Sequence, residues 1–221
     1  MTIEILGNEG AFSDSNTSYL INKNILLDLS DSIAKKLIKE KTAVNHILIS
    51  HKHSDHIGGL ETLLFYYMAI GNFEKELDLT LYVNKDCLDL IECLDSYRHF
   101  IRLNGSVVII NTTDVFYIED LKVQPLFTTH CRGEIENLSF KFDDKVLVTC
   151  DVDSPLVDIE AELVFHDVGW TGLPILSSKV HPTEEEVWKA YGKDINRVYG
   201  IHSSAKLKLL RKAEVGEVFN V

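Results

Sequence analysis

Three histidines and one aspartate fall within the six residues of "HKHSDH", at positions 51–56. Packing explains such a cluster poorly, because each buried imidazole loses its contact with water and needs a partner. Metal binding explains it well, since histidine nitrogens and aspartate oxygens are natural ligands for a borderline ion such as zinc. In an extended loop, residues two apart point the same way, so His51 and His53 could bind one ion while Asp55 and His56 face a second.

Residues of the same types stand directly after apolar runs that read as strands. His130 follows "LFTT", Asp151 follows "VLVTC" and His202 follows "RVYGI". Loops at strand ends are where α/β folds carry their chemistry. The sequence therefore predicts one centre assembled from several strand ends.

The order of these residues resembles the metallo-β-lactamase superfamily, with its H-x-H-x-D-H signature, a later histidine, an aspartate shared by two metals and a final histidine. The stretches "LGNEGAFSDSNTSYLI", "ELVFHDVGW" and "GIHSS" resemble the ribonuclease Z branch in particular, so the similarity covers nearly the whole chain. The resemblance implies an α/β fold, the four-layer αββα sandwich, with residues 1–221 forming a single domain.

The resemblance also implies a dinuclear centre with two zinc ions per chain; Mn²⁺ or another divalent ion would suit similar donors. Bound zinc lowers the pKa of water towards about 7 and so provides a hydroxide. A catalytic role is expected for Asp55 and for His166, our candidate for the proton donor to the leaving group, with Asp167 orienting it. One ion would be held by His51, His53, His130 and Asp151, and the other by Asp55, His56, His202 and Asp151.

Alternatives remain for several of these neighbours. His166 could instead be a strand-end histidine with a structural hydrogen bond, and His181 could support a ligand, cap a helix or lie on the surface. Asp28, in "LLDLS", is a candidate to support a ligand. Cys131 and Cys150 flank ligand positions, and we interpret both as packing residues.

Ser203 and Ser204 open a helix expected over residues 204–212, whose free N–H groups could receive a phosphate; simple capping is the alternative. Four basic residues in this helix could guide an anionic substrate, although such a run usually forms a solvated face.

The departures from ribonuclease Z concern the parts that handle tRNA. Its basic loop near the start is "FSDSN" here, and only residues 131–150 separate His130 from Asp151, where ribonuclease Z carries its tRNA-binding arm. This pattern resembles armless cyclic-nucleotide phosphodiesterases of phages and bacteria. It favours a small anionic substrate over an extended nucleic acid.

Composition agrees with an ordinary globular protein, with 221 residues, 45% of them hydrophobic and 25% charged. A net charge of −12 argues against an extended nucleic-acid surface. The four cysteines form no C-x-x-C pair, and neither a signal peptide nor a membrane span is apparent, so we expect a cytoplasmic protein with no membrane association. A homodimer is compatible with the sequence.

Strands and helices are expected to alternate along the chain. Helices are expected at 31–41 with Ser30 as the N-cap, at 59–70, at 85–100, and after Thr183. Short strands fill most of the remainder, including "HILIS" before the histidine cluster.

We therefore expect a dinuclear zinc phosphodiesterase for a small phosphodiester such as a cyclic nucleotide. The alternatives are a lactone, thioester or β-lactam hydrolase of the same fold and an RNA 3′-end-processing nuclease. A di-iron redox protein is disfavoured because the first motif lacks its extra carboxylate. The complete ligand set argues against a non-catalytic scaffold.

Overall fold

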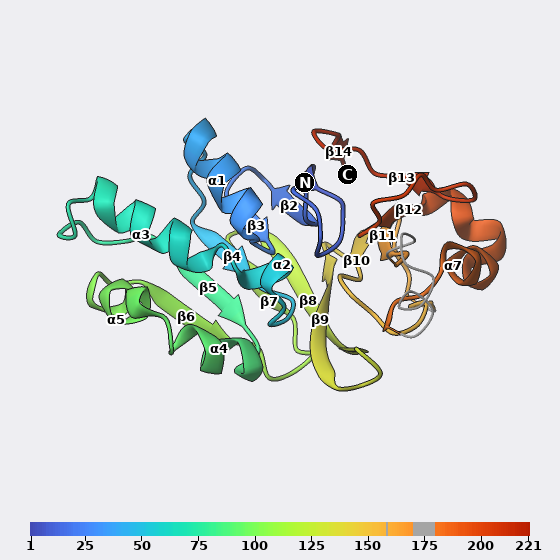
Figure 1. Cartoon of the computed structure of the whole chain (residues 1–221). Coiled ribbons are helices and arrows are strands. Elements are labelled where there is room, and N and C mark those ends of the chain that lie inside the picture. Colours follow the sequence, from blue (N-terminus) through green and yellow to red (C-terminus); the bar gives the residue numbers. More distant parts are fainter. Residues whose placement is uncertain (158, 170–179) are drawn as a thin grey trace.

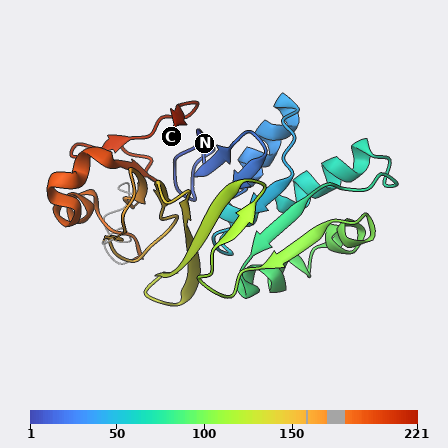
Figure 2. The same cartoon turned by 180° about the vertical axis from the view of Figure 1, so that it is seen from behind.

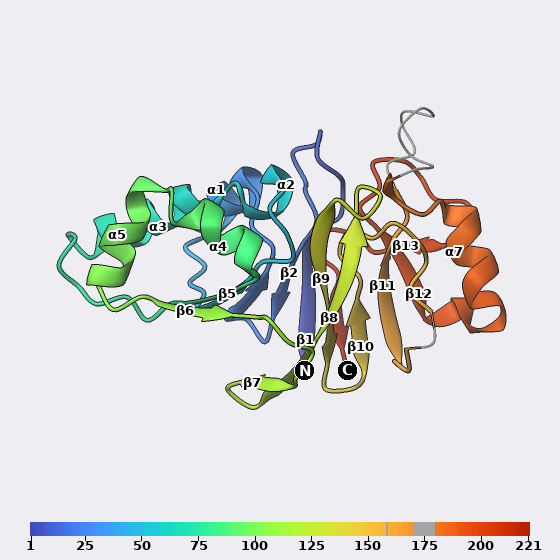
Figure 3. The same cartoon turned by 90° about the horizontal axis from the view of Figure 1, so that it is seen from below.

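Two β-sheets pack face to face in the middle of the molecule, and helices cover both outer faces (Figure 1 and Figure 3). The structure is a computed structural model that describes residues 1–157, 159–169 and 180–221. Within these residues each sheet contains seven strands. This arrangement is the predicted four-layer αββα sandwich.

The first sheet is built mainly from the N-terminal half and has the order β14-β1-β2-β3-β4-β5-β6. Neighbours from β14 to β3 are antiparallel, whereas β3 to β6 run parallel. Its strands are β1 (Thr2–Gly7), β2 (Ser18–Ile21), β3 (Ile25–Leu27), β4 (His46–Leu48), β5 (Thr80–Val83), β6 (Ser106–Ile109) and β14 (Val218–Asn220).

The second sheet has the order β13-β12-β11-β10-β9-β8-β7. Strands β7 to β10 are antiparallel, and β10 to β13 run parallel. The long β8–β9 hairpin crosses the middle of the molecule in the view from behind (Figure 2). The strands are β7 (Phe116–Ile118), β8 (Leu121–His130), β9 (Ile135–Phe142), β10 (Val146–Val148), β11 (Leu163–Asp167), β12 (Val198–Ile201) and β13 (Arg211–Lys212).

Three buried apolar layers follow from this stacking. Ile3, Ile25 and Leu48 of the first sheet meet Phe140 and Phe165 of the second sheet in the central layer. A second cluster lies between the first sheet and its helices, and a third lies between the second sheet and α7. The inner parallel strands β4, β5, β11 and β12 are largely buried on both faces, which explains why they read as continuous apolar runs, whereas β6 and β13 lie at sheet edges and are partly exposed.

Helices α1 to α5 accompany the first sheet and α7 the second (Figure 1). Ser30 caps the first helix by accepting a hydrogen bond from the Ile33 N–H, and Thr183 forms a capping box with Glu186, so both predicted N-caps are confirmed. The helices are α1 (Asp31–Glu40), α2 (Ser54–Ile57), α3 (Leu60–Ile70), α4 (Lys85–Ile91), α5 (Asp95–Arg102) and α7 (Glu184–Tyr191), followed by the 3₁₀ helix η1 (Gly192–Arg197).

The single helix predicted over 85–100 is wrong, because α4 ends at Ile91 and α5 begins at Asp95. The buried positions Leu88 and Ile91 would be followed, in an unbroken helix, by the polar Asp95. A turn before Asp95 instead brings Phe100 into the core on a new helical face.

The helix predicted over 204–212 is also wrong, since no helix forms there and the segment ends in β13. The N–H groups of residues 208–210 all donate to one oxygen of Glu184, at 2.6–2.8 Å. Leu207 and Leu210 are buried against α7. A carboxylate from another helix therefore satisfies these N–H groups, and no helix N-terminus exists at Ser203 to receive a phosphate.

Among the described residues, no helix has the length and apolar character needed to span a membrane.

Candidate metal centre

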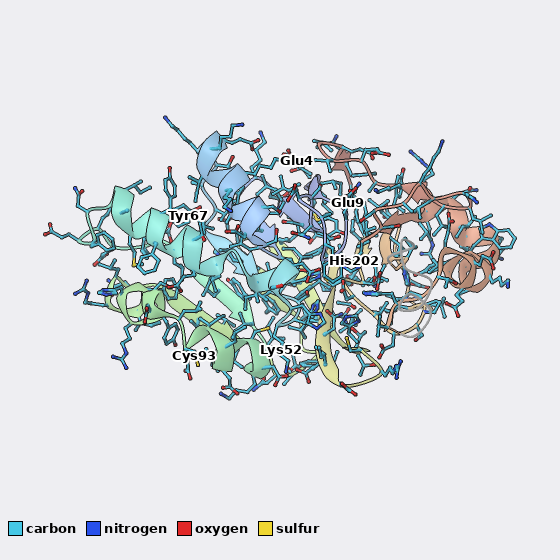
Figure 4. The ribbon with its side chains drawn as sticks, in the orientation of Figure 1. Glu4, Glu9, Lys52, Tyr67, Cys93 and His202 are labelled. Atoms are coloured by element: carbon cyan, nitrogen blue, oxygen red, sulfur yellow. The ribbon has the colours of Figure 1, made fainter. Side chains whose placement is uncertain are left out.

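All seven predicted ligands lie together where the carboxyl ends of the parallel strands of both sheets meet. The cluster "HKHSDH" follows β4, although Ser54–Ile57 form the short helix α2 rather than an extended loop. Figure 4 marks His202, after β12, near the centre of the molecule between its two halves. Four of the predicted ligands come from the segment after β4 of the first sheet, and three lie at strand ends of the second sheet: His51, His53, Asp55, His56, His130, Asp151 and His202.

A first group of donors contains His51, His53, His130 and Asp151. Their ligand atoms lie within 4.8 Å of one another. His51 Nε2 is 2.9 Å from His53 Nδ1, and His130 Nε2 is 3.6 Å from Asp151 Oδ2. Three imidazoles and one carboxylate converging on one point form a suitable set for a divalent transition metal.

A second group contains Asp55, His56 and His202. His56 Nε2 lies 3.4 Å and His202 Nε2 3.3 Å from Asp55 Oδ2. Asp151 joins this group as well, because its Oδ1 is 3.3 Å from His56 Nε2 and its Oδ2 is 3.5 Å from His202 Nε2. Asp151 thus stands between the two groups, where the sequence placed a shared ligand.

Asp28 fixes the orientation of the first-motif histidines from behind. The Nδ1–H of His56 donates to Asp28 Oδ2 at 2.7 Å, which turns His56 Nε2 towards the centre. Ser50 donates to the same carboxylate through its N–H and its hydroxyl, both at 2.8 Å, and its oxygen lies 3.0 Å from His51 Nδ1. The supporting role predicted for Asp28 therefore matches its position.

One observation that does not depend on the family resemblance also indicates that these donors suit divalent cations. Within the part of the chain that the structure describes, Asp151 Oδ1 and His56 Nε2 are buried without a hydrogen bond, even though 3.3 Å separates them. Buried polar atoms normally have a partner, and an unpartnered carboxylate oxygen among imidazole nitrogens is suited to a cation.

The charges of the donor side chains also indicate that the cluster is suited to a cation. Burial lowers the pKa of His202, but Asp151 and hydrogen bonds to Asp167 and Asp55 outweigh it and raise that pKa to about 10. Burial would raise the pKa of Asp151, and the nearby His202 and His56 hold it well below its usual value instead. Without metal, the carboxylates are therefore compensated by protons on the histidines, and these protons must leave when a cation binds.

The structure does not bring His166 to this cluster. Its Nδ1–H donates to the Asp167 carbonyl at 2.7 Å, and its Nε2 accepts from the Leu156 N–H at 2.9 Å. The ring is fully buried and contacts Tyr191 of α7, on the outer side of the sheet. Both nitrogens serve structural hydrogen bonds, so the geometry corrects the predicted proton-donor role of His166.

His181, rather than His166, lies beside the cluster. Its Nδ1 lies 2.7 Å from Asp167 Oδ2, and its ring lies 4.7 Å from that of His130 and 4.8 Å from that of His202. Burial lowers the pKa of His181, but Asp167 outweighs it and raises that pKa. The N–H groups of Val152 and Gly169 donate to Asp167 at 3.0 Å and fix the carboxylate.

The sequence contained a signal for this exchange of roles. Adjacent residues in a strand face opposite sides, so only one of His166 and Asp167, in β11, could face the centre. The short side chain of Asp167 faces it, and the histidine that it binds comes from the segment just before α7 rather than from the strand. Asp167 therefore pairs with His181 beside the cluster, where the sequence predicted a pair with His166.

Solved structures share this fold over nearly the whole chain. A metallo-β-lactamase fold protein, YhfI from Bacillus subtilis, is 17% identical with a TM-score of 0.73, covering 99% of this chain and 98% of its own. Zn²⁺-bound PqqB from Methylobacterium extorquens is 12% identical with a TM-score of 0.70 and full coverage of both chains. These likenesses define a protein of the metallo-β-lactamase fold, with a histidine–aspartate cluster that could hold metal ions.

The sequence comparisons narrow this class to one family. Residues 1–214 match the family described as Anti-Pycsar protein Apyc1. The Anti-Pycsar protein Apyc1 of Bacillus phage BSP38 is 27% identical in an alignment 235 residues long. The alignment covers 90% of this chain and 88% of the relative. The chain belongs to the Anti-Pycsar protein Apyc1 family.

Proposed function

We propose that this protein is a phosphodiesterase that hydrolyses a small phosphodiester such as a cyclic nucleotide, with two Zn²⁺ ions at the centre. The two overlapping donor groups that share Asp151 support a pair of ions, and their imidazole-rich composition favours zinc. Bound ions of this kind activate water and neutralise phosphate charge. In this assignment Asp55 binds the second ion and helps to position the attacking water.

The pairing of His181 with Asp167 is the observation that carries the proposal. The leaving group of a natural phosphodiester is an alkoxide, which is a strong base and needs a proton. The proton is held on His181 Nε2, because Asp167 binds Nδ1 and stabilises the imidazolium. His181 has only 11% of its side chain exposed, so its proton is directed towards the cluster rather than lost to solvent.

The backbone around the centre supports a small substrate. Residues 131–150 form a tight turn, β9, a second tight turn and β10, so no arm projects between His130 and Asp151. Nothing comparable to the tRNA-binding arm is therefore available from this connection. The net charge of −12 also disfavours a long polyanion, whereas a single phosphate can reach a cationic centre.

The same residues discriminate against the alternatives. A lactone or thioester hydrolase would use the same cations but has little need of a dedicated acid for a good leaving group. The resemblance of the sequence to armless phosphodiesterases supports the same conclusion as His181. We place the protein in the cytoplasm, where the four free cysteines would stay reduced.

The test is turnover of the purified, zinc-loaded protein on matched substrates. The panel contains bis(p-nitrophenyl) phosphate, cyclic nucleotides, a γ-lactone, a thioester and a 3′-extended precursor tRNA. Cyclic nucleotides should be hydrolysed with the highest kcat/KM. Faster turnover of the lactone or thioester would replace the proposal with the hydrolase alternative, and preferred processing of the tRNA would replace it with the nuclease.

A further inference from the structure

A third group of metal-donor side chains lies beside the two groups described above. One ligand atom each from Asp151, Asp167, His181 and His202 lies within 4.8 Å of the others. Asp151 and His202 also belong to the groups assigned to the two predicted ions, whereas Asp167 and His181 occur in this group alone. Asp151, Asp167 and His202 are buried, and His181 is largely covered. Imidazoles mixed with carboxylates form a donor set that suits zinc.

The second ring nitrogen of His202 points to a ligand in this third group. Its Nε2 faces Asp55 and Asp151, at 3.3 Å and 3.5 Å. Its Nδ1 is buried and, among the described residues, has no partner at hydrogen-bond distance, although Asp167 Oδ1 lies 3.6 Å away. Two donors of one zinc ion, each about 2.0–2.2 Å from it, lie roughly 3–4 Å apart. The separation is therefore long for a full hydrogen bond and suited to a shared cation.

Asp167 needs a positively charged partner whether or not a cation is bound. Its side chain is fully buried, and the N–H groups of Val152 and Gly169 donate to its two oxygens at 3.0 Å. Neutral N–H groups compensate a buried carboxylate only in part, so a proton on His181, whose Nδ1 lies 2.7 Å from Asp167 Oδ2, supplies the balancing charge. A divalent cation held by Asp167 and His181 would supply this charge in place of the proton.

We propose that a third Zn²⁺ ion binds to Asp167 and His181, with Asp151 and His202 as shared neighbours, and that it inhibits the enzyme. The inhibition rests on the proposed phosphodiesterase activity, whereas the binding does not. A cation on His181 takes the place of the proton that the leaving group needs, so proton transfer to the leaving group is blocked. Because neighbouring cations repel one another, the third ion binds more weakly than the first two. The protein is therefore active with two ions per chain and inhibited by excess zinc.

The test is a count of bound zinc that does not depend on turnover. Metal-free protein is dialysed against rising concentrations of free Zn²⁺, and the zinc bound per chain is measured by elemental analysis. Wild-type protein should bind two ions tightly and a third more weakly, whereas His181→Ala should keep the first two and lose the third. His46→Ala is the control, because His46 forms a histidine–carboxylate pair with Glu119 at the start of β4, away from the cluster that follows its end. It should bind all three ions.

A second measurement relates the third ion to the chemistry. Zinc concentrations that fill the weaker site should slow hydrolysis of a cyclic nucleotide about 10²-fold or more, as the loss of a general acid does. Bis(p-nitrophenyl) phosphate, whose leaving group departs without a proton, should be slowed less than about tenfold. The remaining activity of His181→Ala towards the cyclic nucleotide should not respond to the added zinc.

The outcomes separate the inference from the proposed function. If wild-type protein hydrolyses cyclic nucleotides but binds only two ions, or if His181→Ala binds as many ions as wild type, the third site is wrong and the activity stands. Loss of the third ion in His46→Ala would mean adventitious binding at surface histidines. A third ion that slows both substrates equally, or neither, would overturn the inhibition. If no cyclic nucleotide is hydrolysed, the proposed function fails, and the zinc count still decides the third site.

Discussion

Replacing His181 by alanine should slow the reaction in proportion to how badly the leaving group needs a proton. A positioned general acid contributes about 10²–10⁴-fold to rate, or about 3–5 kcal/mol of barrier. We expect this full loss for a cyclic nucleotide, because the 2.7 Å bond to Asp167 and the contacts with His130 and His202 leave His181 little freedom. A p-nitrophenolate leaves well without protonation, so bis(p-nitrophenyl) phosphate should be slowed less than about tenfold.

His166 supplies the matched control for this prediction. It is one residue from Asp167 and equally buried, but its two nitrogens bond the Leu156 N–H and the Asp167 carbonyl. His166→Gln should therefore lower the free energy of unfolding by about 1–3 kcal/mol while slowing both substrates alike. The assay is steady-state kinetics on both substrates at matched metal content, with urea denaturation for stability.

One pattern of results would refute the reasoning. If His181→Ala slows both substrates equally with its metal retained, His181 is not the acid. If His166→Gln instead gives the leaving-group dependence, the original assignment from the sequence is correct and the hydrogen bonds of His166 must rearrange in the working enzyme.

Three further predictions concern the metal, the pH and one helix cap. Asp151→Ala should lower the total metal content in elemental analysis more than His51→Ala, because the Asp151 carboxylate lies 3.6 Å from His130 in one donor group and 3.3 Å from His56 in the other, whereas His51 belongs to one group alone. Equal metal losses from the two variants would contradict a shared ligand. In EDTA, the urea concentration at the midpoint of unfolding should fall as the pH rises from about 6.5 towards 10. The pKa of His202 is about 10 in the folded protein and about 6.5 in the unfolded chain, so protonation of His202 stabilises the fold fully below pH 6.5, and this stability is lost as the folded group deprotonates. His202→Gln should flatten this dependence. Thr183→Ala should cost about 1 kcal/mol in urea denaturation by removing the capping box with Glu186, and no change would mean that α7 is held by tertiary contacts alone.

The ligands were predictable because a metal centre requires particular donor atoms, and few side chains supply them. The strands before Asp151 and His202 could be predicted as well, since buried parallel strands leave continuous apolar runs. The antiparallel strand that carries His130 could be predicted from the alternating apolar and polar residues at its start. The position of His181 beside the cluster could not be predicted, because it depends on which face of β11 points inwards and on where α7 begins. These are properties of the assembled fold rather than of the local sequence.

The helix expected over 204–212 failed for a related reason. Local propensity favours a helix there, but Glu184, far away in the sequence, offers a better acceptor for the N–H groups of residues 208–210. Such a contact has no local signature.

The pairing of β14 with β1 governs how this chain can be made and modified. The outer edge of β1 stays open during synthesis until residues 218–220 emerge, although its other neighbour β2 begins 11 residues after β1 ends. An open strand edge recruits other chains, so deleting residues 214–221 should yield a protein that aggregates rather than one that merely loses a tail. The Met1 amino group donates to the Val221 carbonyl at 2.9 Å, so the two termini lie side by side (Figure 3). A short linker could therefore join them, allowing new ends to be opened in an exposed turn such as that between β7 and β8.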